Sequence, residues 1–142
     1  TLLAILSFIS VQSQNENLNK ITTTITNYFD GYIYRDIKKL NLAFDTKQGT
    51  MKVPVIEDEK IIGFKNRYFK ELVVKWGNRK KMSKKELNNC ALKILNIDIV
   101  DEKIASAKIS MKVDTVTYID ILSLNKIKSD WKITNKTYVV RK

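Results

Sequence analysis

The residues of this chain that could carry out acid–base or ligand-binding chemistry are one aspartate, several tyrosines and a tryptophan. Asp120 lies in a segment whose apolar residues recur at every second position, so it shares a predicted strand face with Tyr118 and Leu122. A carboxyl group held among apolar side chains can serve as an acid or a base. Because the sequence contains no histidine, tyrosine hydroxyls are the donors left to work with it.

The pairing of the last two predicted strands determines which other side chains lie on this face. If the turn near residue 129 places Leu124 opposite Ile133, strict alternation brings Asn135 onto the same face as Asp120. That face also carries Trp131, so it is the concave one. We expect a ligand pocket of six residues, two on its floor and the others around and above it: Asp120, Asn135, Tyr28, Tyr32, Trp76 and Tyr118.

Two roles for Asp120 stay open. It could act as a catalytic acid or base, with Tyr28 or Tyr32 as the hydrogen-bond donor, or it could bind backbone or a neighbouring hydroxyl and fix the strand register. A single acid without a partner that polarises a carbonyl is an incomplete catalyst, so the sequence favours the structural role and we expect no catalytic residue. If Asp120 and Asn135 point into a pocket beneath Tyr28 and Tyr32, Asp120→Asn should leave the melting temperature little changed or raise it, because an unpaired, desolvated carboxylate is costly to keep ionised. If Asp120 is a structural register residue, the same variant should unfold the protein.

Composition excludes several other chemistries. The chain has 142 residues, which suits one domain, and it has a single cysteine, Cys90. Without a second cysteine or any histidine there is no intramolecular disulfide, Cys/His zinc site or Ser-His or Cys-His nucleophile pair. The glycines are isolated and form no phosphate-binding loop. We therefore expect neither a cofactor nor a metal.

Residues 1–13 are predicted to be the remnant of a secretory signal. The run from Leu2 to Val11 is apolar and uncharged, and it is too short to span a bilayer comfortably. We expect cleavage near Ser13 and Gln14, and a mature periplasmic or secreted bacterial domain at 14–142 with no integral membrane segment. The alternative is an ordinary buried N-terminal helix.

The charge is strongly basic, with a formal net charge of +11. The densest run, Arg79 to Lys85, could contact phosphate, an anionic lipid surface or an acidic ligand. Other lysines, such as Lys108 and Lys136, fall on predicted polar strand faces and are expected to be solvated. Since no nucleic-acid recognition motif with interleaved aromatic residues is present, we expect no nucleic-acid partner.

Hydrophobic periodicity predicts an α+β domain. Helical spacing covers residues 15–34, a shorter segment after Asp36, and a third segment from Phe69 to Trp76. A strand near residues 51–55 contains Pro54, which marks an edge. Ser83 to Glu86 matches a capping box. Alternation then predicts four strands, at residues 92–100, 104–113, 116–126 and 131–140.

Several of these segments resemble a known superfamily. They are Tyr28-Phe29-Asp30-Gly31, Ala105-x-Ala107-Lys108-Ile109, the run from Tyr118 to Leu124, and Trp131-Lys132-Ile133-x-Asn135-Lys136. Together they are similar to the nuclear transport factor 2-like (NTF2-like, SnoaL-like) superfamily, close to its putative lumazine-binding branch. The resemblance implies a cone-shaped fold with about three N-terminal helices packed in the concave face of a bent, mainly antiparallel sheet. It also implies a homodimer through the convex face.

The resemblance leaves three functions open, because this fold hosts isomerases, dehydratases and cyclases as well as proteins without known activity. The first is an exported domain that binds a small aromatic or acidic molecule without turnover. The second is an enzyme of the ketosteroid-isomerase type that uses Asp120. The third is a structural or protein-interaction module that dimerises and has a filled cone.

Overall fold

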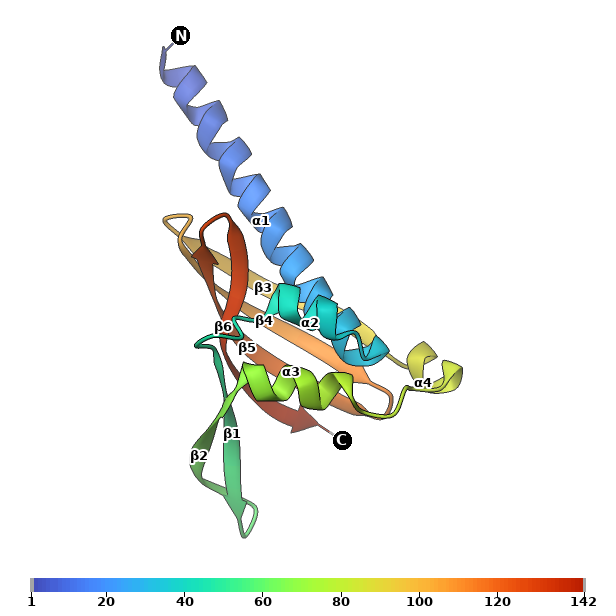
Figure 1. Cartoon of the computed structure of the whole chain (residues 1–142). Coiled ribbons are helices and arrows are strands. Elements are labelled where there is room, and N and C mark those ends of the chain that lie inside the picture. Colours follow the sequence, from blue (N-terminus) through green and yellow to red (C-terminus); the bar gives the residue numbers. More distant parts are fainter. Residues whose placement is uncertain (1, 142) are drawn as a thin grey trace.

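The computed structural model describes the backbone of residues 2–141 and the side chains of residues 12–141. Its elements are, in chain order, α1 (Leu2–Tyr34), α2 (Ile37–Ala43), β1 (Thr50–Glu57), β2 (Lys60–Tyr68), α3 (Phe69–Gly77), α4 (Lys84–Asn88), β3 (Ala91–Val100), β4 (Ile104–Val113), β5 (Val116–Ile127) and β6 (Asp130–Arg141). Helices α1, α2 and α3 lie together on one side of the curved sheet (Figure 1). This is the α+β cone that the sequence predicted.

The sheet has six strands in the order β2-β1-β6-β5-β4-β3. The four C-terminal strands form an antiparallel meander, because each is joined to the next by a short turn. Strand β1 is parallel to β6 and pairs with it only at Thr50 and Met51. We call the space between this sheet and helices α1 to α3 the cone.

The helix ends follow local capping chemistry. The Asp36 carboxylate accepts hydrogen bonds from the backbone N–H groups of Lys38 and Lys39 at the start of α2, as the sequence predicted. The capping box of Ser83 and Glu86 is also confirmed and begins α4.

Helix α1 begins earlier than the periodicity predicted. It runs without interruption from Leu2, and its first turns project beyond the sheet (Figure 1). Among residues 2–141, no helix combines the length and apolarity needed to cross a bilayer. The signal segment at 1–13 stays a prediction.

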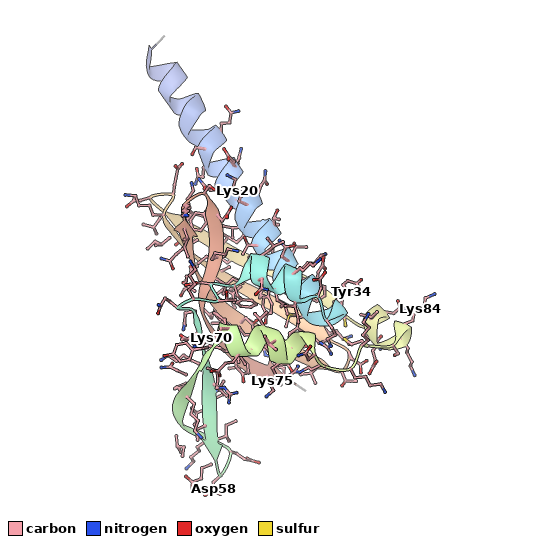
Figure 2. All side chains as sticks on the ribbon, viewed as in Figure 1. Lys20, Tyr34, Asp58, Lys70, Lys75 and Lys84 are labelled. Carbon is pink, nitrogen blue, oxygen red and sulfur yellow. The ribbon has the colours of Figure 1, made fainter. Side chains whose placement is uncertain are left out.

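Strands β1 and β2 form a hairpin whose second strand the sequence analysis did not predict. The hairpin extends away from the rest of the molecule, with Asp58 at its tip (Figures 1 and 2). Pro54 pairs with Phe64 across the hairpin and lies beyond the two residues that pair with β6. One side of β1 is therefore open there, which explains why a strand can accommodate a proline that lacks an N–H group.

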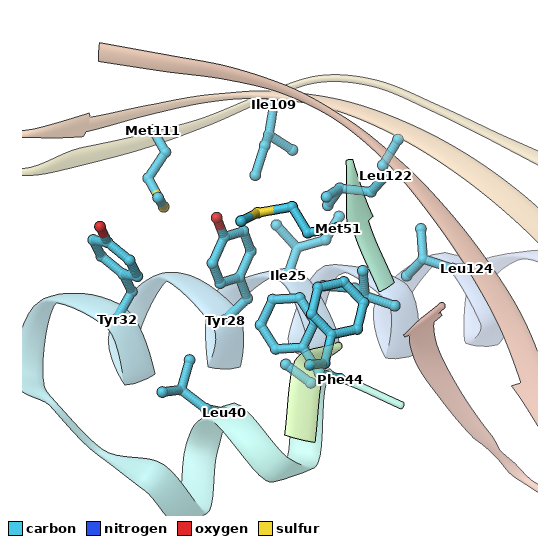
Figure 3. Packing of buried hydrophobic residues seen from close by; sticks show 14 of the residues in the cluster. Ile25, Tyr28, Tyr32, Leu40, Phe44, Met51, Ile109, Met111, Leu122 and Leu124 are labelled. Carbon is cyan, nitrogen blue, oxygen red and sulfur yellow. The ribbon is translucent and has the colours of Figure 1, made fainter. Parts of the chain in front are cut away.

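The core fills most of the cone. Figure 3 shows Tyr28 and Tyr32 of α1 directed toward the sheet, where Ile109, Met111 and Leu122 face them. The inward-facing side chains of β4, β5 and β6 are buried, among them Ala107, Ile109, Leu122, Trp131 and Ile133. The indole Nε1 of Trp131 donates a hydrogen bond of 3.0 Å to Oδ1 of the buried Asn17, which satisfies its polar atom inside the core.

Candidate functional site

A β-bulge in β6 determines which side chains of this strand face the cone. Leu124 pairs with Ile133, as predicted, but the next residue, Ser123, pairs with Asn135. Thr134 is therefore an extra residue on β6, and its hydroxyl lies 2.6 Å from Oδ1 of Asn125 on the partner strand. One extra residue reverses the side on which every later residue of β6 lies.

This bulge corrects the expected register. Asp120 pairs with Tyr138, and Leu122 pairs with Lys136, so Lys136 and Tyr138 lie on the face that had been assigned to Asn135. The Asn135 amide instead donates hydrogen bonds of 3.1 Å to the backbone oxygen and to Oγ1 of Thr50 on β1. The prediction that Asn135 forms the floor of the pocket was therefore wrong, and so was the prediction that Lys136 is solvated.

Lys136 forms an ion pair with Asp120 inside the protein. Its Nζ lies 2.8 Å from Oδ2 of Asp120, and the two side chains are only 4% and 0% exposed. Lys136 also donates a hydrogen bond to the hydroxyl of Tyr28, which in turn donates to Oδ2 of Asp120 at 3.0 Å. The neighbouring hydroxyl that the structural role of Asp120 requires is thus Tyr28.

Four aromatic rings surround the Lys136 ammonium group. Its Nζ lies 4.9 Å from the ring centroid of Tyr28, 5.2 Å from that of Tyr138, and 5.9 Å from those of Trp76 and Tyr118. Aromatic faces carry negative potential, so they stabilise a desolvated cation in addition to its carboxylate partner. This enclosure explains how a lysine can be buried on an otherwise apolar floor.

Burial raises the pKa of three phenol groups in the cone. Desolvation raises the pKa of Tyr28 well above its usual value, and the neighbouring Asp120 carboxylate raises it further. Burial raises the pKa of Tyr118 to about 12. Burial and then Asp120 raise the pKa of Tyr138 in the same direction. At neutral pH these hydroxyls are uncharged and can donate hydrogen bonds.

A cavity of about 110 Å³ opens above this floor, and we call it the cone cavity. It is lined by four aromatic residues, two methionines and two basic residues: Tyr32, Trp76, Tyr118, Tyr138, Met51, Met111, Arg79 and Lys136. Of the predicted pocket residues, Tyr32, Trp76 and Tyr118 line it. Tyr28 and Asp120 lie in the same cluster but behind the lining, and Asn135 is outside it.

Arg79 lies at the outer side of the cone cavity, where the chain leaves α3. Its Nη1 donates a hydrogen bond of 2.6 Å to the hydroxyl of Tyr32, and its guanidinium carbon lies 5.5 Å from the centroid of the same ring. The side chain of Tyr32 therefore holds the first residue of the predicted basic run against the cone.

The carboxylate of Asp120 is not open to the cone cavity. A catalytic base must reach the proton that it abstracts, whereas Oδ2 of Asp120 is occupied by Lys136 and Tyr28, and the carboxylate does not line the cavity. The other oxygen, Oδ1, is buried and has no hydrogen-bond partner among the described side chains. Within the same residues, no three Cys, Asp or Glu side chains are grouped so that they could hold a metal ion.

A wider groove of about 340 Å³ lies outside the cone, between α1 and the turn that joins β5 to β6. Threonine and asparagine side chains of α1 line much of it, and no predicted pocket residue does. It lacks the clustered aromatic rings of the cone, and its one ion pair, Glu16 with Lys20, is exposed. We therefore place the candidate site in the cone cavity.

Sequence reasoning missed Lys136, Tyr138 and Arg79 as parts of the site. One signal was available for the first two: the large residues of β6 are Trp131 and Ile133 at odd positions but Tyr138 at an even one. Such a change of parity within one strand indicates a bulge. No comparable signal separates Arg79 from the other basic residues of its run.

Comparison with known proteins agrees with this architecture. Residues 16–139 match the family model described as "Putative lumazine-binding". No curated protein matches the chain.

Three similar solved structures have the same fold. An NTF2-like protein of unknown function from Shewanella baltica has a TM-score of 0.72 at 23% identity, covering 89% of this chain and 95% of that one. Another, from Methylobacillus flagellatus, has a TM-score of 0.70 at 23% identity, covering 89% and 94%. A ketosteroid isomerase-like protein from Erwinia carotovora atroseptica has a TM-score of 0.63 at 14% identity, covering 90% and 98%.

At these identities the structural matches show the fold alone, whereas the family match extends over most of the sequence. The chain belongs to the putative lumazine-binding family, and it has the fold of NTF2-like proteins.

Proposed function

We propose that this chain is an exported domain that binds a small molecule in the cone cavity and releases it unchanged. The observation that carries the proposal is the composition of the cavity, in which aromatic rings and methionines surround a few polar groups. This combination is typical of small-molecule sites, where apolar surface supplies affinity and polar groups fix orientation. The family of the chain supports the same class of function.

The position of Asp120 supports binding without turnover. The carboxylate lies behind Lys136, and one of its oxygens is fully used by Lys136 and Tyr28. A ligand in the cavity therefore meets an ammonium group and phenols rather than a free base. The enzyme alternative would require Asp120 to exchange these partners for a substrate.

Export is supported by the apolar run at residues 1–13 and by the start of the family match at residue 16, just after it. The test is N-terminal sequencing of the protein recovered from the periplasm or medium of its natural host. A mature N-terminus near Gln14 is expected, and an intact Leu2 to Ser13 segment would contradict export.

Binding is tested by a thermal-shift screen with lumazine and other pterins, flavin-like rings and small aromatic acids. Tyr118→Trp narrows the cone cavity and should abolish the shift, whereas Tyr34→Trp on the exposed part of α1 is the matched control and should preserve it. Any bound compound is then recovered and identified by mass spectrometry. If the protein converts a compound to a product and this conversion is lost in Tyr28→Phe, the enzyme alternative would replace the binding function.

A second candidate is the dimerising interaction module, which the small cavity volume favours. Apolar side chains lie on the outer, convex face of β5 and β6, including Ile121 and Val139, which are 47% and 51% exposed. A homodimer through this face would cover them. Light scattering on wild type and Ile121→Lys tests it: a dimer that becomes a monomer in the variant, together with no hit in the screen, would favour the module.

A further inference from the structure

We infer that the ligand of the cone cavity is a small planar monocarboxylate whose acid group is bound by Arg79. This inference rests on the proposed binding function and concerns the chemical class of the ligand. The charges around the cavity do not cancel.

Only one of the two cations that line the cavity has an acidic partner. Lys136 is paired with Asp120 at 2.8 Å. Among side chains 12–141, no carboxylate forms an ion pair with Arg79, and its hydrogen bond to Tyr32 goes to a neutral phenol. The lining also contains no Asp or Glu. The cavity therefore presents one uncompensated positive charge, which favours a ligand with one negative charge.

The geometry of Arg79 suits a carboxylate. Guanidinium groups present a planar fork of N–H donors that matches the two oxygens of a carboxylate. The bond from Nη1 to the Tyr32 hydroxyl uses one donor and holds the fork in place at the cavity. Tyr118 lines the same cavity; burial raises its pKa to about 12, and its hydroxyl is protonated at neutral pH and can donate a hydrogen bond.

The size and walls of the cavity favour a planar acid. A volume of about 110 Å³ is small; an apolar cavity of about 150 Å³ is known to hold benzene. One end of a ligand can therefore enter, where it meets the aromatic rings of the lining; Tyr32 packs edge to face with Trp76 at 5.5 Å and with Tyr118 at 6.4 Å. A phosphate would bring a second negative charge that no lining residue balances.

The experiment compares three probes on the full chain by titration calorimetry: benzoate, its neutral isostere benzamide, and phenyl phosphate. Benzoate should bind most tightly, with benzamide weaker by about tenfold, because a neutral amide cannot form an ion pair with the Arg79 guanidinium. Arg79→Gln should remove this preference, so that benzoate and benzamide bind with affinities within about twofold of each other. Arg67→Gln removes the same charge from the exposed hairpin and is the matched control.

The outcomes separate the two proposals. Equal binding of benzoate and benzamide would overturn the carboxylate class while leaving small-molecule binding intact, and tighter binding of phenyl phosphate would overturn it in favour of a dianion. An equal loss of benzoate affinity in Arg67→Gln and Arg79→Gln would also overturn the carboxylate class, since an equal loss would show general attraction to a basic surface. If none of the probes and no compound of the wider screen binds, the binding function itself fails.

Discussion

Lys136 and Asp120 are held together by a 2.8 Å contact between an ammonium group and a carboxylate that are both shielded from water. Removing one member of such a pair leaves the other charge buried without compensation. The expectation that Asp120→Asn keeps or raises the melting temperature was drawn for an unpaired acid. The presence of Lys136 reverses it.

We therefore predict that Asp120→Asn lowers the free energy of unfolding by about 3–5 kcal/mol. The double variant Asp120→Leu/Lys136→Met, which removes both charges, should recover much of the loss. Urea denaturation followed by circular dichroism measures both, and Lys112→Met on the exposed face of β4 is the matched single-lysine control. A loss below about 1 kcal/mol in Asp120→Asn would show that the ion pair does not stabilise the fold.

Stability should fall at high pH because of the cone tyrosines. The pKa of Tyr118 is about 12 in the folded protein, against an ordinary value of 10.0, so the unfolded chain loses this proton first. The stabilisation is fully present below pH 10.0 and is lost as the pH rises toward 12. The raised pKa of Tyr28 and of Tyr138 adds to the loss in the same direction.

Urea midpoints measured across the alkaline range test this dependence. Tyr118→Phe should show a shallower fall than wild type, because one of the groups that titrates differently in the two states is gone. Tyr34→Phe is the matched control, since Tyr34 is 55% exposed. Parallel curves for wild type and Tyr118→Phe would be inconsistent with the raised pKa.

The hydrogen bond between Trp131 and Asn17 should be measurable separately from the packing of the indole. Trp131→Ala should cost about 3–5 kcal/mol of unfolding free energy because it empties a large core site. Asn17→Ala should cost about 1–3 kcal/mol, since it leaves the indole N–H buried without its acceptor. Trp131→Phe/Asn17→Ala should cost less than the sum of its single changes, and full additivity would show that the two residues act independently.

Two glycines provide a matched pair for testing close packing. A Cβ at Gly49 would lie 2.4 Å from the backbone oxygen of Asp45 and 2.5 Å from Cδ2 of the buried Phe69, whereas a Cβ at Gly63 would have no neighbour within 4 Å. Gly49→Ala should destabilise the protein by about 1–3 kcal/mol. Gly63→Ala should be neutral or slightly stabilising. Thermal unfolding of the two variants compares them directly, and equal melting temperatures would contradict the contact.

The sequence alone predicted those elements of the fold that have a local pattern of their own. Alternation located β3 to β6, and the carboxylate of Asp36 and the capping box of Ser83 marked two helix starts. It was insufficient for β2, where adjacent apolar residues, Ile61 and Ile62, break the alternation and the strand packs against no core. Local patterns predict local structure, and this hairpin has little tertiary contact to reinforce them.

The candidate site was predicted less well, because it depends on pairing between elements distant in sequence. Tyr32, Trp76 and Tyr118 face the cone as their periodicity implied, since each lies in an element with unbroken spacing. The assignment of Asn135 failed because it assumed strict alternation along β6. Thr134 has no partner on β5, so the residues after it lie on the opposite face from the one that alternation assigns to them. Arg79 could not be distinguished from its basic neighbours without the position of the Tyr32 hydroxyl.

The extra residue at Thr134 has a consequence for how the cone can change during evolution. Loss of this single residue would produce a regular strand that still directs Lys136 inward, because Asn135 already pairs with Ser123 and Lys136 with Leu122. A chain of unchanged length that straightened the bulge would instead place an amide where the ammonium group now lies. A shift in strand alignment can therefore change which side chain lies on the cone floor, with no substitution at residue 135 or 136.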